Sequence, residues 1–149
     1  MHSCRPCEAP RMIRGLYQRA LTSLLGDRPQ WSDITKPLES LPIDPDSILE
    51  GAPVATAVTL TESKDGRYRC GIWDCTAGRF HWFFVLDEIV HILEGEVFIE
   101  YDGRTTRLKA GDVAYFPVGA ATIWRVPVRV RKFFTHRQRT TLVRRLRGL

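Results

Sequence analysis

The sequence lacks any long run of apolar residues. Its longest apolar stretches are far shorter than the roughly 20 residues needed to cross a bilayer, so no membrane-spanning segment is expected. Methionine and cysteine are also scarce, with two and four residues in a chain of 149. The apolar fraction of 44% is nevertheless that of an ordinary globular protein. The length predicts one domain with a real core rather than two domains.

The few cysteines exclude a disulfide framework, and no leader of the secretory type precedes them. Cys4 and Cys7 have the spacing of half a zinc site, and Cys70 and Cys75 are the candidates for the other half. Cys70 and Cys75 lie five residues apart in a strand-like run, so their side chains should point to opposite faces. We therefore expect a cytoplasmic protein with reduced thiols and no zinc site.

Acidic residues are absent from 125–149, which hold nine arginines and lysines. Residues 1–124 carry 13 basic and 17 acidic side chains, so the net charge of +5 comes from the basic end. We favour a solvated end that pairs with acids of the body, although such an end also suits nucleic acid. The arginines available to that partner are Arg137, Arg139, Arg144, Arg145 and Arg147.

Apolar spacing predicts an amphipathic helix over 12–25 and then a proline-punctuated arm over 36–53. Beyond the arm, about nine short strands separated by turn signals indicate an all-β sandwich or jelly-roll barrel. The expected strands are 54–60, 67–75, 79–86, 89–93, 96–101, 104–108, 113–117, 121–126 and 128–134. We expect three segments: an N-terminal tail with helix and arm (1–47), a barrel (48–136) and a basic C-terminal tail (137–149).

Two sequence motifs, separated by a hairpin, have the arrangement seen in a known protein family. The first, "DEIVHILEG", ends at Gly95, and the second, "GDVAYFPVG", ends at Gly119, with a hairpin that has "DG" at its tip between them. This arrangement resembles the two motifs of the cupin superfamily. With "ILEGAPVA", "GIWDCTAGRFHW" and "VRVRKFF", the chain over 48–134 looks like the single-domain cupins related to ureidoglycine aminohydrolase. The resemblance implies a double-stranded β-helix barrel, commonly a homodimer, with a pocket inside.

The resemblance also implies where a cupin metal would bind: two histidines one residue apart, a glutamate, and a third histidine after the second motif. Residues two apart on a strand share a face, so two imidazoles and a carboxylate can hold one ion. In this sequence the two positions of that histidine pair are occupied by His81 and Phe83, in the register that we favour, or by Trp82 and Phe84. The third position is Thr122.

His81 and Glu88 are what remains of the expected ligands, whereas catalytic sites have at least three. His91 faces away by strand alternation, and His136 lies beyond the last matching strand. We favour a pocket with little or no metal. Two alternatives stay open: a divalent metal (Mn, Zn, Ni or Fe) completed by another residue or subunit, and a pocket too filled to bind anything.

The pocket wall should include side chains that share a face with the replaced ligands. We expect His81, Phe83, Glu88, Val90, Thr122 and Trp124, with Trp73 and Tyr115 as further candidates. Such an aromatic cleft suits a small polar molecule with a flat or apolar part. Glu88 would have a raised pKa if it were buried without a partner, and Asp87 is expected in solvent. Arg129 and Arg131 share a face and should meet a partner's acid or a substrate carboxylate.

These observations predict a single-domain cupin that binds an unidentified small molecule, cytoplasmic and homodimeric, with no catalytic residues assigned. One alternative is a metal-dependent enzyme resembling ureidoglycine aminohydrolase, which by that resemblance would hydrolyse a C–N bond. A second alternative is a regulatory module whose arginine-rich end binds nucleic acid. No recognition helix or aromatic platform in the sequence favours that second alternative.

Overall fold

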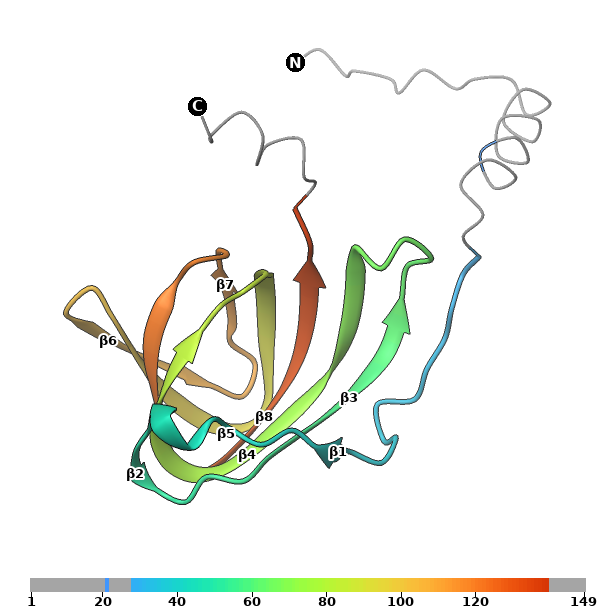
Figure 1. Cartoon of the computed structure of the whole chain (residues 1–149). Helices are drawn as coiled ribbons and strands as arrows, with labels where there is room; N and C mark the ends of the chain where they lie inside the picture. The colour runs from blue at the N-terminus through green and yellow to red at the C-terminus, as the bar shows by residue number, and fades with distance from the viewer. Residues whose placement is uncertain (1–20, 22–27, 140–149) are drawn as a thin grey trace, which may run out of the picture. The chain divides into compact units, whose positions relative to one another are not determined.

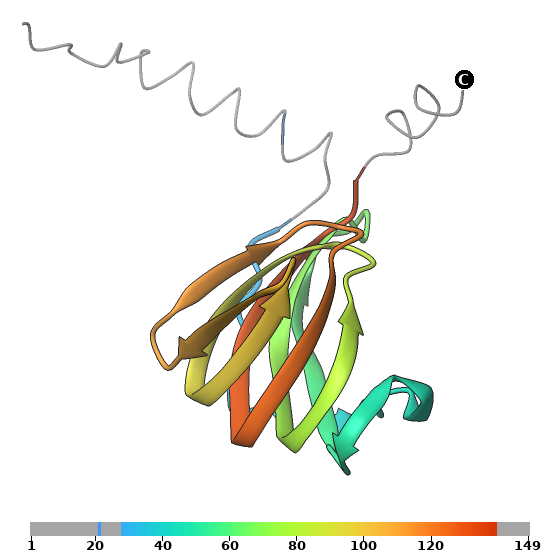
Figure 2. The ribbon, with the colours of Figure 1, turned by 90° about the vertical axis from the view of Figure 1, so that its left-hand side faces the viewer.

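The computed structural model describes residues 21 and 28–139, and the described residues from Trp31 onward belong to one compact unit. Their strands form one antiparallel sheet that curls strongly on itself (Figure 1 and Figure 2). The expected all-β class is confirmed. No helix in this part of the chain is long and apolar enough to cross a membrane. The helix expected over 12–25 lies, apart from Leu21, outside the described residues, as does the chain beyond 139.

Eight strands and one 3-10 turn make up the described fold. They are β1 (Glu39–Ser40), η1 (Pro45–Ser47), β2 (Ile48–Gly51), β3 (Ala55–Glu62), β4 (Tyr68–Phe83), β5 (Asp87–Tyr101), β6 (Arg104–Lys109), β7 (Val113–Phe116) and β8 (Ala121–Arg137). The order across the sheet is β1-β3-β4-β8-β5-β6, with β2 paired to β4 and β7 paired to β5. The proline-punctuated arm is therefore part of the sheet, since it supplies β1 and β2.

Three strands, β4, β5 and β8, are much longer than the sequence predicts. Each joins two of the expected short strands, because the apparent breaks are irregularities within a continuous ladder. In β4 the register shifts between Thr76 and Gly78, and in β5 it shifts after Gly95. Pro127 of β8 falls where neither neighbouring strand pairs with it, so its missing N–H costs no ladder bond. Bulges bend strands, which accounts for the curl of the sheet in Figure 1.

The inner face of the curled sheet carries the hydrophobic core. Its most buried members, each no more than 2% exposed, include Phe80, Phe84, Val90, Ile92, Val97, Trp124 and Val130. The Phe84 ring stacks on Phe116 with a centroid separation of 4.4 Å, so this part of the interior is filled with carbon. The unfilled part of the interior lies against β1, β3 and the first half of β4.

A substitution of Gly95 tests whether the bend of strand β5 needs a glycine at this position. It has a φ of 73°, and a methyl group there would overlap the carbonyl oxygen of Arg129 on β8. We expect Gly95→Ala to lower the free energy of unfolding by about 3 kcal/mol or more, because left-handed strain adds to a steric clash.

Gly103→Ala is the matched control, because Gly103 has a φ of 70° and nothing lies within 4 Å of the added atom. It should cost only about 1–2 kcal/mol. Urea unfolding measures both variants, and equal losses would show that the contact with Arg129 does not constrain position 95.

Candidate functional site

A cavity of about 470 Å³ opens among strands β1, β3, β4, β5 and β8. This volume lies within the range of sites for small molecules. Its wall combines three aromatic rings with five ionisable groups. The rings are Trp73, Trp82 and Phe134, and the ionisable residues are Glu39, Arg69, Glu88, Lys132 and His136.

Lys132 on β8 is a buried cation in this wall, only 1% exposed. Its Nζ donates a hydrogen bond of 2.7 Å to Glu88 Oε1. The same ammonium lies between 4.6 and 5.8 Å from the ring centroids of Trp73, Trp82 and Trp124, within range of cation–π attraction. Removing an ammonium from water costs several kcal/mol unless it is paired. Here one carboxylate and three indoles offset that cost.

A hydrogen-bonded chain leads from Glu88 to the exposed Arg69. His136 Nε2 lies 3.1 Å from Glu88 Oε2, and Arg69 Nε donates to His136 Nδ1 at 3.0 Å. Because Nδ1 accepts from Arg69, it carries no proton, and the neutral imidazole has its proton on Nε2. His136 therefore donates to Glu88, and both oxygens of that carboxylate are engaged.

Glu88 is held in its ionised form. Burial alone would raise its pKa, but the Lys132 ammonium and the hydrogen bond from His136 outweigh burial and lower the pKa from 4.5 to about 2. The raised pKa considered from the sequence assumed that Glu88 had no partner. Because Glu88 has two partners, Lys132 and His136, its pKa is lowered and not raised.

Five of the predicted pocket residues lie in or beside the cavity. Trp73 and Glu88 line it. Trp124 and Thr122 are buried next to it, where Trp124 Nε1 donates to Thr122 Oγ1 at 3.0 Å and the Trp124 ring contacts the indole of Trp73. Val90 is buried in the adjoining core.

The other three, His81, Phe83 and Tyr115, are exposed on the opposite face, with Phe83 62% exposed. The bulge at 76–78 explains the first two, because one extra residue reverses which side chains point inward. The alternative register, which begins at Trp82, therefore faces the interior. His81 instead borders a second hollow of about 430 Å³ beside the β5–β6 hairpin.

Sequence reasoning missed four of the five ionisable cavity residues: Glu39, Arg69, Lys132 and His136. The placement of His136 beyond the last strand is wrong, because β8 continues to Arg137. A signal was present, since Lys132, Phe134 and His136 follow one another at every second position and so share a face of the strand. What the spacing could not show is that this face meets Glu88.

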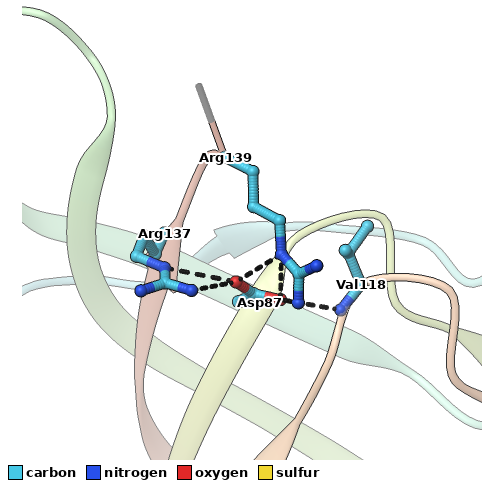
Figure 3. Close-up of polar contacts among 4 residues, drawn as sticks. All are labelled: Asp87, Val118, Arg137 and Arg139. Atoms are coloured by element: carbon cyan, nitrogen blue, oxygen red, sulfur yellow. Dashed lines mark hydrogen bonds and ion pairs between the residues drawn. The ribbon is translucent and has the colours of Figure 1, made fainter. Parts of the chain in front are cut away.

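Asp87 is not in solvent, contrary to expectation, but only 3% exposed on the face opposite to Glu88. Figure 3 shows its contacts: Arg137 Nη2 at 2.7 Å, Arg139 Nη2 at 2.9 Å and the backbone N–H of Val118 at 3.0 Å. The hydrogen bonds from Arg139, with those from Val118 and Arg137, hold the pKa of Asp87 well below its usual range. These two arginines were candidates for a nucleic-acid contact, and the other three candidates lie outside the described residues.

Arg129 and Arg131 share the outer face of β8, and the acid they meet is Asp74 on β4 of the same chain. Arg129 Nη2 lies 2.6 Å and Arg131 Nη1 3.9 Å from Asp74 Oδ2.

Cys70 and Cys75 are free thiols, and burial together with the charge of Asp74 raises the pKa of Cys75 to about 12. Cys75 is therefore an unreactive core thiol.

A metal ion of the cupin type does not fit this cavity. Glu88 already engages Lys132 and His136, and a divalent ion at its carboxylate would meet the ammonium 2.7 Å away. Across residues 21 and 28–139, no group of three His, Cys, Asp or Glu side chains is placed to hold a metal. His81, the other candidate ligand, lies on the opposite face. The cation at Glu88 is supplied by the chain itself.

The curled antiparallel sheet with a cavity in its interior defines a cupin, as the sequence resemblance predicts. Residues 62–134, just under half of the chain, match the family model of the EutQ-like cupin domain. The matched residues include Arg69, Glu88 and Lys132 of the cavity but not Glu39 or His136.

Several bacterial proteins are similar to this chain in sequence or in structure. The acetate kinase EutQ of Salmonella typhimurium is 33% identical over 72 residues, which are 48% of this chain and 31% of that protein. The structure of an ethanolamine utilization protein Q from Salmonella typhimurium aligns with a TM-score of 0.52 and 24% identity, over 74% of this chain and 98% of that one. A DUF861-family protein from Pseudomonas syringae aligns with a TM-score of 0.65 and 25% identity, over 70% of this chain and 46% of that one.

The ion pair in the cavity predicts a large effect of Lys132→Met. This substitution should lower the free energy of unfolding by about 3–5 kcal/mol, because it leaves Glu88 buried without its cation. Adding Glu88→Gln to it should recover part of the loss, since no charge then needs compensation. Urea unfolding of the two single variants and the double variant gives the coupling energy.

Lys109→Met, at an exposed position on β6, is the control and should change stability by no more than about 0.5 kcal/mol. A double variant no more stable than Lys132→Met would refute the pairing.

Acid unfolding gives an independent test of Glu88. Its lowered pKa means that the ionised form contributes up to about 3 kcal/mol of stability above pH 4.5, which is lost as the pH falls from 4.5 toward 2. We expect the unfolding free energy of the wild type to fall more steeply over this window than that of Glu88→Gln. Asp87 also loses stabilising energy as the pH falls, but it does so in both proteins, so its contribution cancels when the two curves are compared. Parallel curves would mean that Glu88 has an ordinary pKa.

Proposed function

We propose that this chain is a cupin that binds a small molecule in a cavity whose fixed cation is Lys132. The main support for this proposal is the buried Lys132–Glu88 ion pair, which lies among indoles in the wall of a cavity of about 470 Å³. Well-packed apolar residues often stabilise a core as much as a buried ion pair or more. A buried charge pair in the wall of a ligand-sized cavity therefore supports a role in recognition rather than in stability alone.

A second candidate is an enzyme, which the names of the curated relatives support. Both are called acetate kinase, and the match spans 31% of the Salmonella typhimurium protein and 18% of the Escherichia coli protein. Their activity therefore belongs to chains with much sequence that this match does not include. Incubation with acetate and ATP, followed by measurement of ADP, tests whether the chain has such an activity.

The alternatives drawn from the sequence gain less support. Hydrolysis of a C–N bond by a bound metal, as in ureidoglycine aminohydrolase, needs donors that this cavity does not bring together. Binding of nucleic acid loses two of its arginines to Asp87. The homodimer remains a prediction, to be measured by light scattering.

A thermal-shift screen of small polar molecules tests the binding function. A ligand at about 100 times its Kd should stabilise the chain by roughly 3 kcal/mol, which corresponds to an increase in Tm of about 6–12 °C. Ala57→Phe should abolish these shifts, because Ala57 lines the cavity from β3 and a phenyl ring there fills it.

Thr105→Phe adds the same ring at an exposed position on β6 and should keep every shift. Ligands that stabilise wild type and Ala57→Phe equally would bind elsewhere, and the proposed site would then be wrong.

A further inference from the structure

Arg69 is a cavity cation without an acidic partner. Its Nε donates to the imidazole of His136 at 3.0 Å, and the Nη edge of the guanidinium is not part of that hydrogen bond. Ten of the ion pairs in this part of the chain join an arginine or lysine to a carboxylate, and Arg69 is in none of them. A guanidinium with a free edge is the side chain best suited to hold a carboxylate or phosphate through two parallel hydrogen bonds.

Two further groups of the wall are hydrogen-bond donors. The Lys132 ammonium has three N–H groups, and Glu88 is its one acceptor among the described residues. The indole N–H of Trp73 has no hydrogen-bond partner there either. Both oxygens of Glu88, the buried acid of the wall, are already bonded. An occupant that completes this wall must therefore bring acceptors.

The charges of the cavity wall lie at separate places. Glu88 is neutralised by Lys132, and His136 is neutral while it accepts from Arg69. The remaining acid is Glu39, which is exposed on β1 and forms no ion pair with Arg69. Two opposite charges thus remain in the wall, Arg69 on β4 and Glu39 on β1, and an anion that enters the cavity is attracted to Arg69.

Flat walls surround these donors. Trp82 is half-buried and Trp73 almost wholly buried, and both present indole surface to the cavity together with Phe134. Planar apolar groups pack well against such faces. The volume of about 470 Å³ has room for a ring and its substituent.

We propose that the occupant of this cavity is a small planar carboxylate, such as an aryl carboxylate, with its anion on the free edge of Arg69 and its flat part against Trp82 and Trp73. This inference rests on the proposed binding function and specifies its ligand class. It assigns Arg69 as the residue that selects for charge.

Three probes separate the parts of the inference. Benzoate has the ring and the charge, benzamide has the ring without the charge, and acetate has the charge without the ring. Titration of the full-length chain is followed by ¹H–¹⁵N NMR of the four indole N–H signals. Trp73, Trp82 and Trp124 report on the cavity, whereas Trp31, 87% exposed, is the internal control.

We expect benzoate to shift the cavity indoles but not Trp31, and to bind at least about tenfold more tightly than benzamide or acetate. Arg69→Gln should bring benzoate to the affinity of benzamide. Arg67→Gln, an exposed arginine on the same hairpin paired with Asp65, is the matched control and should leave all three affinities unchanged. Unchanged signals elsewhere in the spectrum show that each variant is folded.

Benzamide bound as tightly as benzoate, or benzoate bound equally by Arg69→Gln, would overturn the choice of an anion while the binding cavity stands. Acetate bound as tightly as benzoate would overturn the planar part. If no probe shifts a cavity indole, the ligand class is wrong, and the thermal-shift screen with Ala57→Phe decides separately whether the cavity binds anything.

Discussion

The buried ion pair between Lys132 and Glu88 is the constraint on which the interior depends. An ammonium and a carboxylate lie 2.7 Å apart in a region where neither is stable alone, so each fixes the place of the other. Three indoles surround the ammonium, and the imidazole of His136 takes the second carboxylate oxygen. The aromatic walls of the cavity are thereby arranged around a charge that the chain itself supplies.

A lysine differs from a metal ion in the chemistry that it offers a ligand. A metal ion accepts electron pairs and orders several donors around itself, whereas an ammonium only donates hydrogen bonds. The groups that meet Lys132 must therefore be acceptors or π-faces, and Glu88 and the indoles are of these two kinds. This cupin interior selects among ligands by hydrogen bonds, charge and shape.

Alternation and turn signals were sufficient to predict the all-β class, and the resemblance to the cupin motifs pointed to Glu88, which lines the cavity. They failed where the outcome depends on pairing between distant segments. The bulge at 76–78 exchanges the two faces of β4, and a count of residues from a motif cannot reveal such a shift. Lys132 and His136 meet Glu88 only because β8 pairs with β5, and that register is a property of the whole sheet.

That register is locked from both faces at one place. Asp87 lies opposite Arg137 and Glu88 opposite His136, so two neighbouring residues of β5 face two neighbouring residues of β8. On the outer face Asp87 and Arg137 form an ion pair at 2.7 Å. On the inner face Glu88 and His136 are joined by a hydrogen bond of 3.1 Å. A slip of one residue would exchange inner and outer groups and break both. The outer arginine therefore helps to hold the inner carboxylate in place, although it never touches the cavity.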